Sequence, residues 1–143
     1  MRSIFNEKNL NSKKILLRLD LNVPLKNGVI SDTSRIDKIL PTLNFLIQQK
    51  TKIIILSHVG RPNGKIVKEL SLKPISEDLR KKLDSSVRLI TEKIYNIKNK
   101  NFFEKFDEQI LILENIRFYD GEEKNDRNFA QHLATLGDIY VND

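Results

Sequence analysis

Five short apolar runs along the chain have the length and continuity of strands buried in a sheet. They cover residues 14–20, 52–57, 87–90, 109–113 and 139–141. Between the runs, apolar residues recur three and four positions apart, which predicts amphipathic helices; the clearest case is Ile36, Ile39, Leu43 and Ile47. This alternation of strands and helices predicts an α/β fold with a mostly parallel sheet and helices on both of its faces.

Polar residues and prolines mark where the first two helices begin. Asp32 is a plausible N-cap for the helix that carries Ile36, and Pro41 inside that helix predicts a kink or a restart. Ser71 offers a cap for the next helix, and Pro74 suits its first turn.

The second half of the chain has weaker helical signals. Residues 91–107 predict one or two short helices. Asn125 or Asp126 is the expected N-cap of a last helix that carries Phe129, and Gly137 is the expected C-terminal stop.

Composition indicates one ordinary globular domain. The chain has 143 residues, of which 39% are hydrophobic and 31% charged, and it has no cysteine. Disulfides and thiolate metal sites are therefore excluded, and no apolar run approaches the roughly 20 residues that a membrane-spanning helix needs. The N-terminus lacks the pattern of a secretory signal, so we expect a cytoplasmic protein.

The net charge of +6 allows nucleic acid, an anionic membrane surface or an acidic small molecule as a partner. The excess of lysine over arginine, together with abundant asparagine and isoleucine, also fits a composition bias without functional meaning. The placement of particular arginines is more informative than the total charge.

Ligands of open parallel sheets bind beyond the carboxyl ends of the strands. Three segments follow predicted strands, and Arg35 lies near the start of the first helix at the same edge; the segments are residues 20–24, 57–62 and 114–118. Together they bring Arg35, Arg61 and Arg117 to one rim. Because guanidinium groups bind phosphate and carboxylate oxygens bidentately, this rim predicts a site for a small, highly anionic metabolite.

Each of these residues also has an ordinary explanation when it is taken alone. Asp20 and Asn22 can satisfy backbone groups in a turn, and a single arginine is usually a surface residue. The joint placement at one edge favours the site. Competing motifs fail: the stretch from Gly60 to Ile66 is too short for a P-loop and has no Ser or Thr after Lys65, and no dinucleotide fingerprint follows any strand.

The same segments resemble the signatures of phosphoglycerate kinases, in the order of that family. The matching stretches are residues 18–24, 31–36, 57–62, 71–74, 113–118, 121–126 and 138–143. The departures are mild: Leu21 stands where an aromatic residue is commoner, Ser34 where threonine is commoner, and Val59 replaces leucine. None of them removes a polar group from the site.

The resemblance implies an incomplete, Rossmann-like three-layer αβα fold. Residues 1–143 would be part of the N-terminal, 3-phosphoglycerate-binding domain, and the C-terminal domain that binds Mg-ATP or Mg-ADP would be absent. The family transfers a phosphoryl group reversibly between 1,3-bisphosphoglycerate and ADP, giving 3-phosphoglycerate and ATP in glycolysis and gluconeogenesis. The truncated chain alone is expected to be inactive and loosely packed or prone to aggregate.

The resemblance also implies a role for each matching site residue. Asp20 and Asn22 would contact the hydroxyl end of the substrate, and Arg35 would face its carboxyl end and steady the transferring phosphoryl group as the catalytic residue. His58, Arg61 and Arg117 would hold the far phosphate, and Val59 and Gly60, which lie between His58 and Arg61, would also bind substrate. No metal ligand is expected in this chain.

Two alternatives stay open. The first is a truncated phosphoglycerate-binding module without catalytic activity, or a gene remnant. The second is a basic α/β domain that binds nucleic acid, although its lysines lack interleaved aromatic residues. We expect a monomer whose partner is the small-molecule substrate, without nucleic acid or membrane binding.

Overall fold

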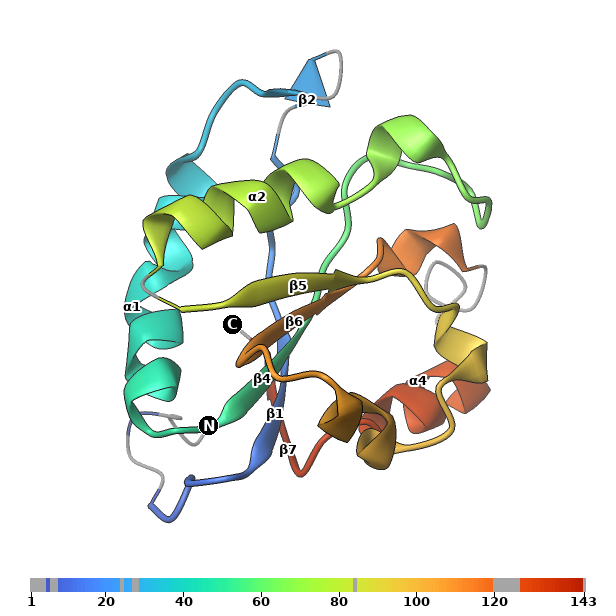
Figure 1. Ribbon diagram of the computed structural model, residues 1–143. Helices are drawn as coiled ribbons and strands as arrows, with labels where there is room; N and C mark the ends of the chain where they lie inside the picture. The colour runs from blue at the N-terminus through green and yellow to red at the C-terminus, as the bar shows by residue number, and fades with distance from the viewer. Residues whose placement is uncertain are drawn as a thin grey trace.

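A computed structural model describes residues 5, 8–23, 25–26, 29–83, 85–119 and 127–142. Five parallel strands form one sheet in the order β5-β6-β4-β1-β7 (Figure 1). The strands are β1 (Lys14–Arg18), β4 (Lys52–Leu56), β5 (Val87–Ile90), β6 (Ile110–Leu113) and β7 (Ile139–Asn142). All four neighbouring pairs are parallel, so the predicted parallel sheet is confirmed.

Alternation along the central strands divides the apolar core into two clusters, one on each face of the sheet. Ile15 and Leu17 of β1 join the first cluster, whereas Leu16 between them joins the second. All four residues of β6 are buried. The continuous apolar runs of the sequence therefore reflect strands that are covered on both faces.

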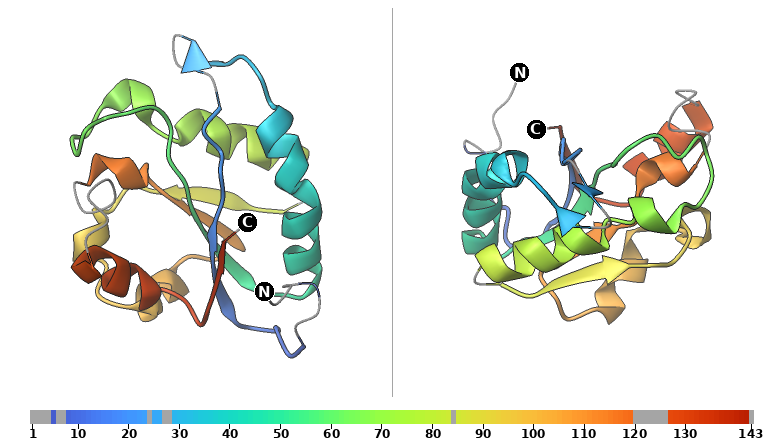
Figure 2. Two further views of the ribbon diagram at one scale, coloured as in Figure 1. Left: turned by 180° about the vertical axis from the view of Figure 1, so that it is seen from behind. Right: turned by 90° about the horizontal axis from the view of Figure 1, so that it is seen from above.

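Helices cover both faces, as Figure 2 shows. Helices α1 (Ser34–Gln48) and α2 (Lys73–Lys82) supply residues to the first cluster. The second cluster takes residues from α4 (Arg127–Ala134) and from the short 3₁₀-helices η3 (Ile94–Asn96), η4 (Lys100–Lys105) and η5 (Ile116–Phe118). The predicted α/β layers are confirmed, and so are the short helices predicted for residues 91–107.

Helix starts and breaks differ from the sequence predictions in detail. Helix α1 continues through Pro41 without a restart; Pro41 lies on the exposed side, where water can replace the missing hydrogen bond. The N-cap position of α1 is Thr33, not Asp32, although the Asp32 carboxylate accepts a hydrogen bond from the Ser34 N–H (2.9 Å). The N-cap of α2 is likewise Leu72, one residue after Ser71.

Gly137 has a different role from the predicted helix stop. Its backbone does not adopt the positive φ of a glycine cap. A Cβ atom at this position would lie 2.9 Å from Leu16 Cβ and 3.2 Å from the Lys14 carbonyl oxygen, so glycine lets the chain pass close to β1. The predicted cap at Asn125 or Asp126 lies outside the described residues.

A small antiparallel ribbon was not predicted. It pairs β2 (Leu25–Lys26) with β3 (Val29–Ile30) and is separate from the main sheet. The signal was present, because the dipeptide Asn27-Gly28, preceded by Leu25-Lys26 and followed by Val29-Ile30, is typical of a hairpin turn. The 3₁₀-helix η2 (Lys68–Leu70), which precedes α2, was also not predicted.

Candidate anion-binding site

The loops that follow β1 and β4 are joined by neutral hydrogen bonds. The Ser57 hydroxyl donates to the Leu19 carbonyl (2.8 Å) and accepts from the Leu21 N–H (3.0 Å). The Asn22 side-chain carbonyl accepts from the Gly60 N–H (3.1 Å). Two segments nearly 40 positions apart in sequence are thus held against each other at the carboxyl ends of their strands.

The loop after β6 is joined to the loop after β4 through Asn115, whose exposed fraction is 0%. Its amide nitrogen donates to the carbonyls of Val59 (2.8 Å) and Leu70 (2.9 Å), and its amide oxygen accepts from the Arg117 N–H (3.1 Å). The Ile116 N–H also donates to the Ser57 carbonyl (3.1 Å). One buried amide therefore fixes three backbone segments.

Glu114 connects this cluster of loops to the start of α2. Its carboxylate accepts from the Ser71 hydroxyl (2.7 Å) and from the Leu72 N–H (2.7 Å). A carboxylate at this position also complements the positive end of the helix dipole. Sequence reasoning did not assign roles to Ser57, Glu114 or Asn115; the available signal was their position directly after buried strands.

The start of α1 is joined to the loop after β1 by an ion pair. Arg35 Nη1 donates to Asp20 Oδ1 (2.7 Å), and both side chains are exposed. Asp20 Oδ1 also accepts from the Asn22 N–H (3.3 Å). This contact uses one of the five N–H donors of the guanidinium group, which leaves others for a bound anion.

Gly60 occupies a backbone conformation that only glycine adopts without strain. Its φ is +65°, and a Cβ atom there would lie 2.8 Å from Leu70 Cδ2. Glycine therefore allows the loop after β4 to turn close to Leu70, with the Gly60 N–H group directed at the Asn22 side chain.

The remaining predicted residues lie in the same cluster of loops. Val59 is buried, His58 and Arg117 are partly buried, and Arg61 is exposed. Arg117 Nε is buried and has no hydrogen-bond partner. Among the described residues, no carboxylate forms an ion pair with Arg61 or Arg117. The structure thus brings together every segment that carries a predicted site residue, while their contacts with a substrate stay predictions.

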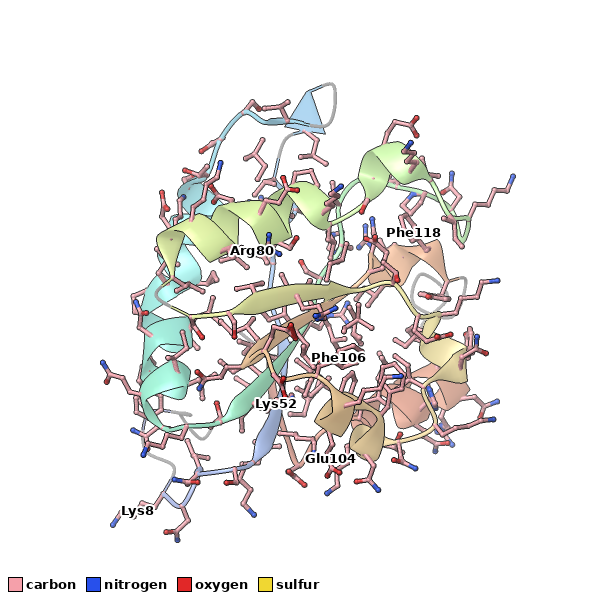
Figure 3. The ribbon with its side chains drawn as sticks, in the orientation of Figure 1. Lys8, Lys52, Arg80, Glu104, Phe106 and Phe118 are labelled. Carbon is pink, nitrogen blue, oxygen red and sulfur yellow. The ribbon has the colours of Figure 1, made fainter. Side chains whose placement is uncertain are left out.

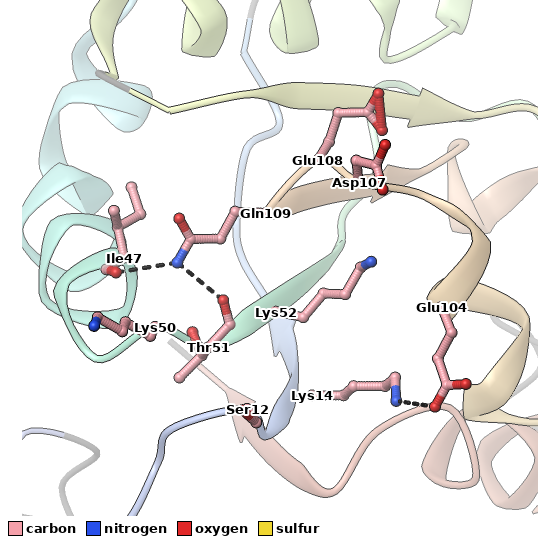
Figure 4. Close-up of a pocket in the computed structure, with 10 residues that line it drawn as sticks. All are labelled: Ser12, Lys14, Ile47, Lys50, Thr51, Lys52, Glu104, Asp107, Glu108 and Gln109. Carbon is pink, nitrogen blue, oxygen red and sulfur yellow. Dashed lines mark hydrogen bonds and ion pairs between the residues drawn. The ribbon is translucent and has the colours of Figure 1, made fainter.

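A hollow of about 460 Å³ lies at the opposite, amino ends of β1 and β4 (Figure 4). Lys14 Nζ donates to Glu104 (3.1 Å), and Lys52 Nζ donates to the Phe106 carbonyl. Burial, followed by the nearby charge of Lys14, lowers the pKa of Lys52. Two of the three lysines of this hollow thus have partners within the protein, and its lining also includes the carboxylates of Glu104, Asp107 and Glu108, so it is a poor match for an anionic ligand.

The described part of the chain contains no group of three or more His, Cys, Asp or Glu side chains that could hold a metal ion. It also contains no helix that is both long and apolar enough to cross a bilayer.

The fold and the site define an α/β domain with arginine-bearing loops at the carboxyl edge of a parallel sheet. A family model described as phosphoglycerate kinase matches residues 5–143. The chain therefore belongs to the phosphoglycerate kinase family.

Individual relatives agree with this assignment. The phosphoglycerate kinase of Borrelia garinii subsp. bavariensis is 43% identical over 144 residues, which cover 99% of this chain and 37% of the relative. That of Chelativorans sp. is 46% identical over 136 residues, covering 95% and 34%. The chain thus spans about a third of the length of the curated relatives it matches.

Solved structures give the same picture. Phosphoglycerate kinase from Coxiella burnetii aligns with a TM-score of 0.81 and 42% identity over 94% of this chain and 33% of that one. The enzyme from Pyrococcus horikoshii OT3 aligns with a TM-score of 0.75 and 29% identity, covering 94% and 35%. The predicted Rossmann-like fold and family are confirmed by these alignments.

Proposed function

We propose that this chain forms the phosphoglycerate-binding part of a cytoplasmic phosphoglycerate kinase, which transfers a phosphoryl group reversibly between 1,3-bisphosphoglycerate and ADP. The observation that carries the proposal is the convergence of Arg35, Arg61 and Arg117 from linked loops at one sheet edge. Family membership supplies the reaction, and the charge of the rim fits the anionic substrate.

The three arginines bind different parts of the substrate. Arg61 and Arg117, with His58 in the same group of loops, hold the far phosphate. Arg35 faces the carboxyl end, where charge spreads over the equatorial oxygens during transfer. Asp20 holds Arg35 at 2.7 Å, and Asp20 and Asn22 orient the hydroxyl end of the substrate.

The protein residues of this site act by position and charge. Phosphoryl transfer requires little covalent help from a protein, so holding the acceptor oxygen in line and neutralising negative charge are the main contributions. The magnesium-bound nucleotide is bound by residues outside this chain, and the chain alone binds substrate without transferring phosphate.

Calorimetry with 3-phosphoglycerate tests the proposal. We expect saturable binding that weakens with added salt, and no binding of uncharged glycerol. Absence of 3-phosphoglycerate binding by the folded chain, or salt-sensitive binding of an oligonucleotide in its place, would contradict it. A coupled assay with ATP and 3-phosphoglycerate should show no turnover by this chain alone. Turnover would contradict the proposal that residues outside this chain bind the nucleotide.

A further inference from the structure

Strand β5 lies at one end of the sheet and pairs only with β6 among the described strands. The Ile110 N–H of β6 donates to the Ser86 carbonyl (3.1 Å). In a parallel pair, alternate residues direct both backbone groups to the same neighbour. Ser86 and Arg88 therefore face β6, whereas Val87 and Leu89 present their backbone groups to the outside.

Most of these outward groups are available for a further strand. Arg80 Nη2 of α2 donates to the Val87 carbonyl (3.0 Å). No hydrogen bond within the described residues occupies the Val87 N–H or either backbone group of Leu89. An unpaired edge of this kind is a template on which an extended peptide can add a strand.

Hollows lie on both sides of this edge. One, of about 680 Å³, lies beside α2 and is lined in part by Lys73, Arg80 and Leu89. The other, of about 170 Å³, lies beside η4 and is lined in part by Phe102 and Lys105. Since successive side chains of a strand point to opposite faces, an added strand would fill the two hollows alternately.

Figure 3 shows the two flanking positions. Arg80 lies between α2 and β5, and Phe106 lies on the other side of β5. The arrangement agrees with the contacts, because Arg80 bonds to Val87 and the Arg88 guanidinium lies 5.4 Å from the centre of the Phe106 ring.

The charges around β5 favour an acidic occupant. Four cations line the two hollows, against three carboxylates; they are Lys73, Arg80, Arg88 and Lys105, against Glu77, Glu92 and Glu108. Arg88 is paired with Glu108 (2.7 Å). Lys105 has no ion pair within the described residues, and its ammonium lies 4.0 Å from the centre of the Phe102 ring, which holds a positive charge beside the edge.

A second copy of this chain fits the edge less well. Antiparallel pairing of β5 with itself, in the register that uses the outward groups of Val87 and Leu89, places Arg88 opposite its own symmetry mate. Like charges directly opposite each other destabilise a strand pair.

We propose that the outer edge of β5 docks an extended acidic peptide segment of a partner protein by strand addition. The partner's backbone bonds to Val87 and Leu89, and its acidic side chains reach Lys105 on one side and Lys73 and Arg80 on the other. This surface lies along the side of the sheet, apart from the loops that are proposed to bind phosphoglycerate.

Hydrogen exchange measured by NMR on the folded 143-residue chain tests the proposal. The probe is a short blocked peptide that repeats the unit Glu-Glu-Thr-Thr, which places glutamates on both faces of the added strand, and the control peptide replaces glutamate with lysine. We expect the acidic peptide to slow exchange of the Leu89 amide and the lysine peptide to have no effect.

Two variants connect the binding to the named charges. Lys105→Glu should weaken the acidic peptide's Kd about tenfold, because it places like charges at the contact. Lys98→Glu, an exposed change outside both hollows, should leave that Kd unchanged, and both variants should bind 3-phosphoglycerate normally.

Three results would overturn the proposal. They are unchanged Leu89 exchange with the acidic peptide, equal protection by the lysine peptide, and an equal effect of Lys105→Glu and Lys98→Glu. Protection of Leu89 that rises with protein concentration alone would assign the edge to self-association.

Discussion

The two ends of the β1–β4 pair carry similar numbers of charged groups but use them differently. At the amino ends, Lys14 and Lys52 bond to groups of the protein itself. At the carboxyl ends, the loops after β1, β4 and β6 are joined to one another by neutral groups of Ser57, Asn22 and Asn115. The carboxylates of Asp20 and Glu114 bond there to residues at the starts of α1 and α2, which are Arg35 and Ser71. Within the described residues, this leaves Arg61 and Arg117 without carboxylate partners.

The difference shows why local charge alone is a poor guide to a binding site. Lys14 and Lys52 already have partners that compete with a ligand, whereas Arg61 and Arg117 have no carboxylate partner among the described residues, so their charge is available to an anion. Arg35 is paired with Asp20, but this contact uses only one of its five N–H donors. The carboxyl edge is therefore the end at which we expect an anionic substrate, although the amino edge has a hollow lined by three lysines.

The largest expected effect is on the scaffold of the carboxyl edge. Asn115→Ala removes three hydrogen bonds and leaves the buried Val59 carbonyl and the partly buried Leu70 carbonyl without this donor, which should lower the free energy of unfolding by about 3 kcal/mol. Urea unfolding followed by circular dichroism measures this change. The matched control is Asn44→Ala on the exposed side of α1, which should change stability little; equal losses would contradict the role of Asn115.

The next effect concerns binding. Arg117→Met keeps much of the side-chain volume but removes the charge and the unpaired Nε donor, so 3-phosphoglycerate should bind about tenfold to a hundredfold more weakly. Calorimetry measures the Kd. Lys50→Met at the amino-edge hollow is the control and should bind 3-phosphoglycerate with the Kd of the unmodified chain. If Lys50→Met weakened binding more than Arg117→Met, the substrate would bind at the amino ends and our comparison would be wrong.

Backbone conformation at the site gives a smaller effect. Gly60→Ala forces a φ of +65° on a residue with a Cβ atom and displaces Leu70. We expect a loss of about 1–2 kcal/mol in the free energy of unfolding. Thermal unfolding checks it, and an unchanged midpoint would show that the loop relaxes without strain.

The smallest expected effect is on how stability depends on pH, which should differ between the charged groups near the amino ends and the neutral groups at the carboxyl ends of the β1–β4 pair. The Lys100 ammonium, followed by the Lys14 N–H, lowers the pKa of Asp138 below its ordinary value of 3.8. A lowered folded-state pKa means that the carboxylate stabilises the protein above that ordinary value and that this contribution is lost as the pH falls through the folded-state pKa.

When the pH falls from neutral to below 3.8, the free energy of unfolding of the Asp138→Asn variant should therefore decrease less than that of the unmodified chain. Urea unfolding at a series of pH values measures this. The Asn115→Ala variant, which changes only neutral groups, should show the same decrease in the free energy of unfolding on acidification as the unmodified chain. If both variants changed this pH dependence equally, the two ends would not differ in the way we describe.

The sequence predicted the sheet, its faces and the loops that form the site, because these depend on patterns that are local in the chain. Ile15 to Leu17 and Ile110 to Leu113 are apolar without interruption, and strands buried on both faces require this. Family motifs then indicated which loop residues we propose to contact substrate.

The connections between loops were not predictable from local patterns. Asn115 bonds to Val59 and Leu70, which are 56 and 45 positions away, and Glu114 bonds to Ser71 and Leu72. Gly137 reads as a helix stop in sequence, yet its contact with Leu16 in β1 explains it. Such contacts depend on which strands become neighbours. The β2–β3 hairpin is a different case, because its turn dipeptide is a local signal that was not used in the prediction.

The most direct test of the central claim is a titration of the isotope-labelled chain with 3-phosphoglycerate, followed by amide NMR shifts. We predict saturable shifts at Asn22, Gly60 and Arg117, and none at Lys14, Lys52 and Gln109. Shifts confined to the amino-edge residues, or no saturable shift in the folded chain, would contradict the account.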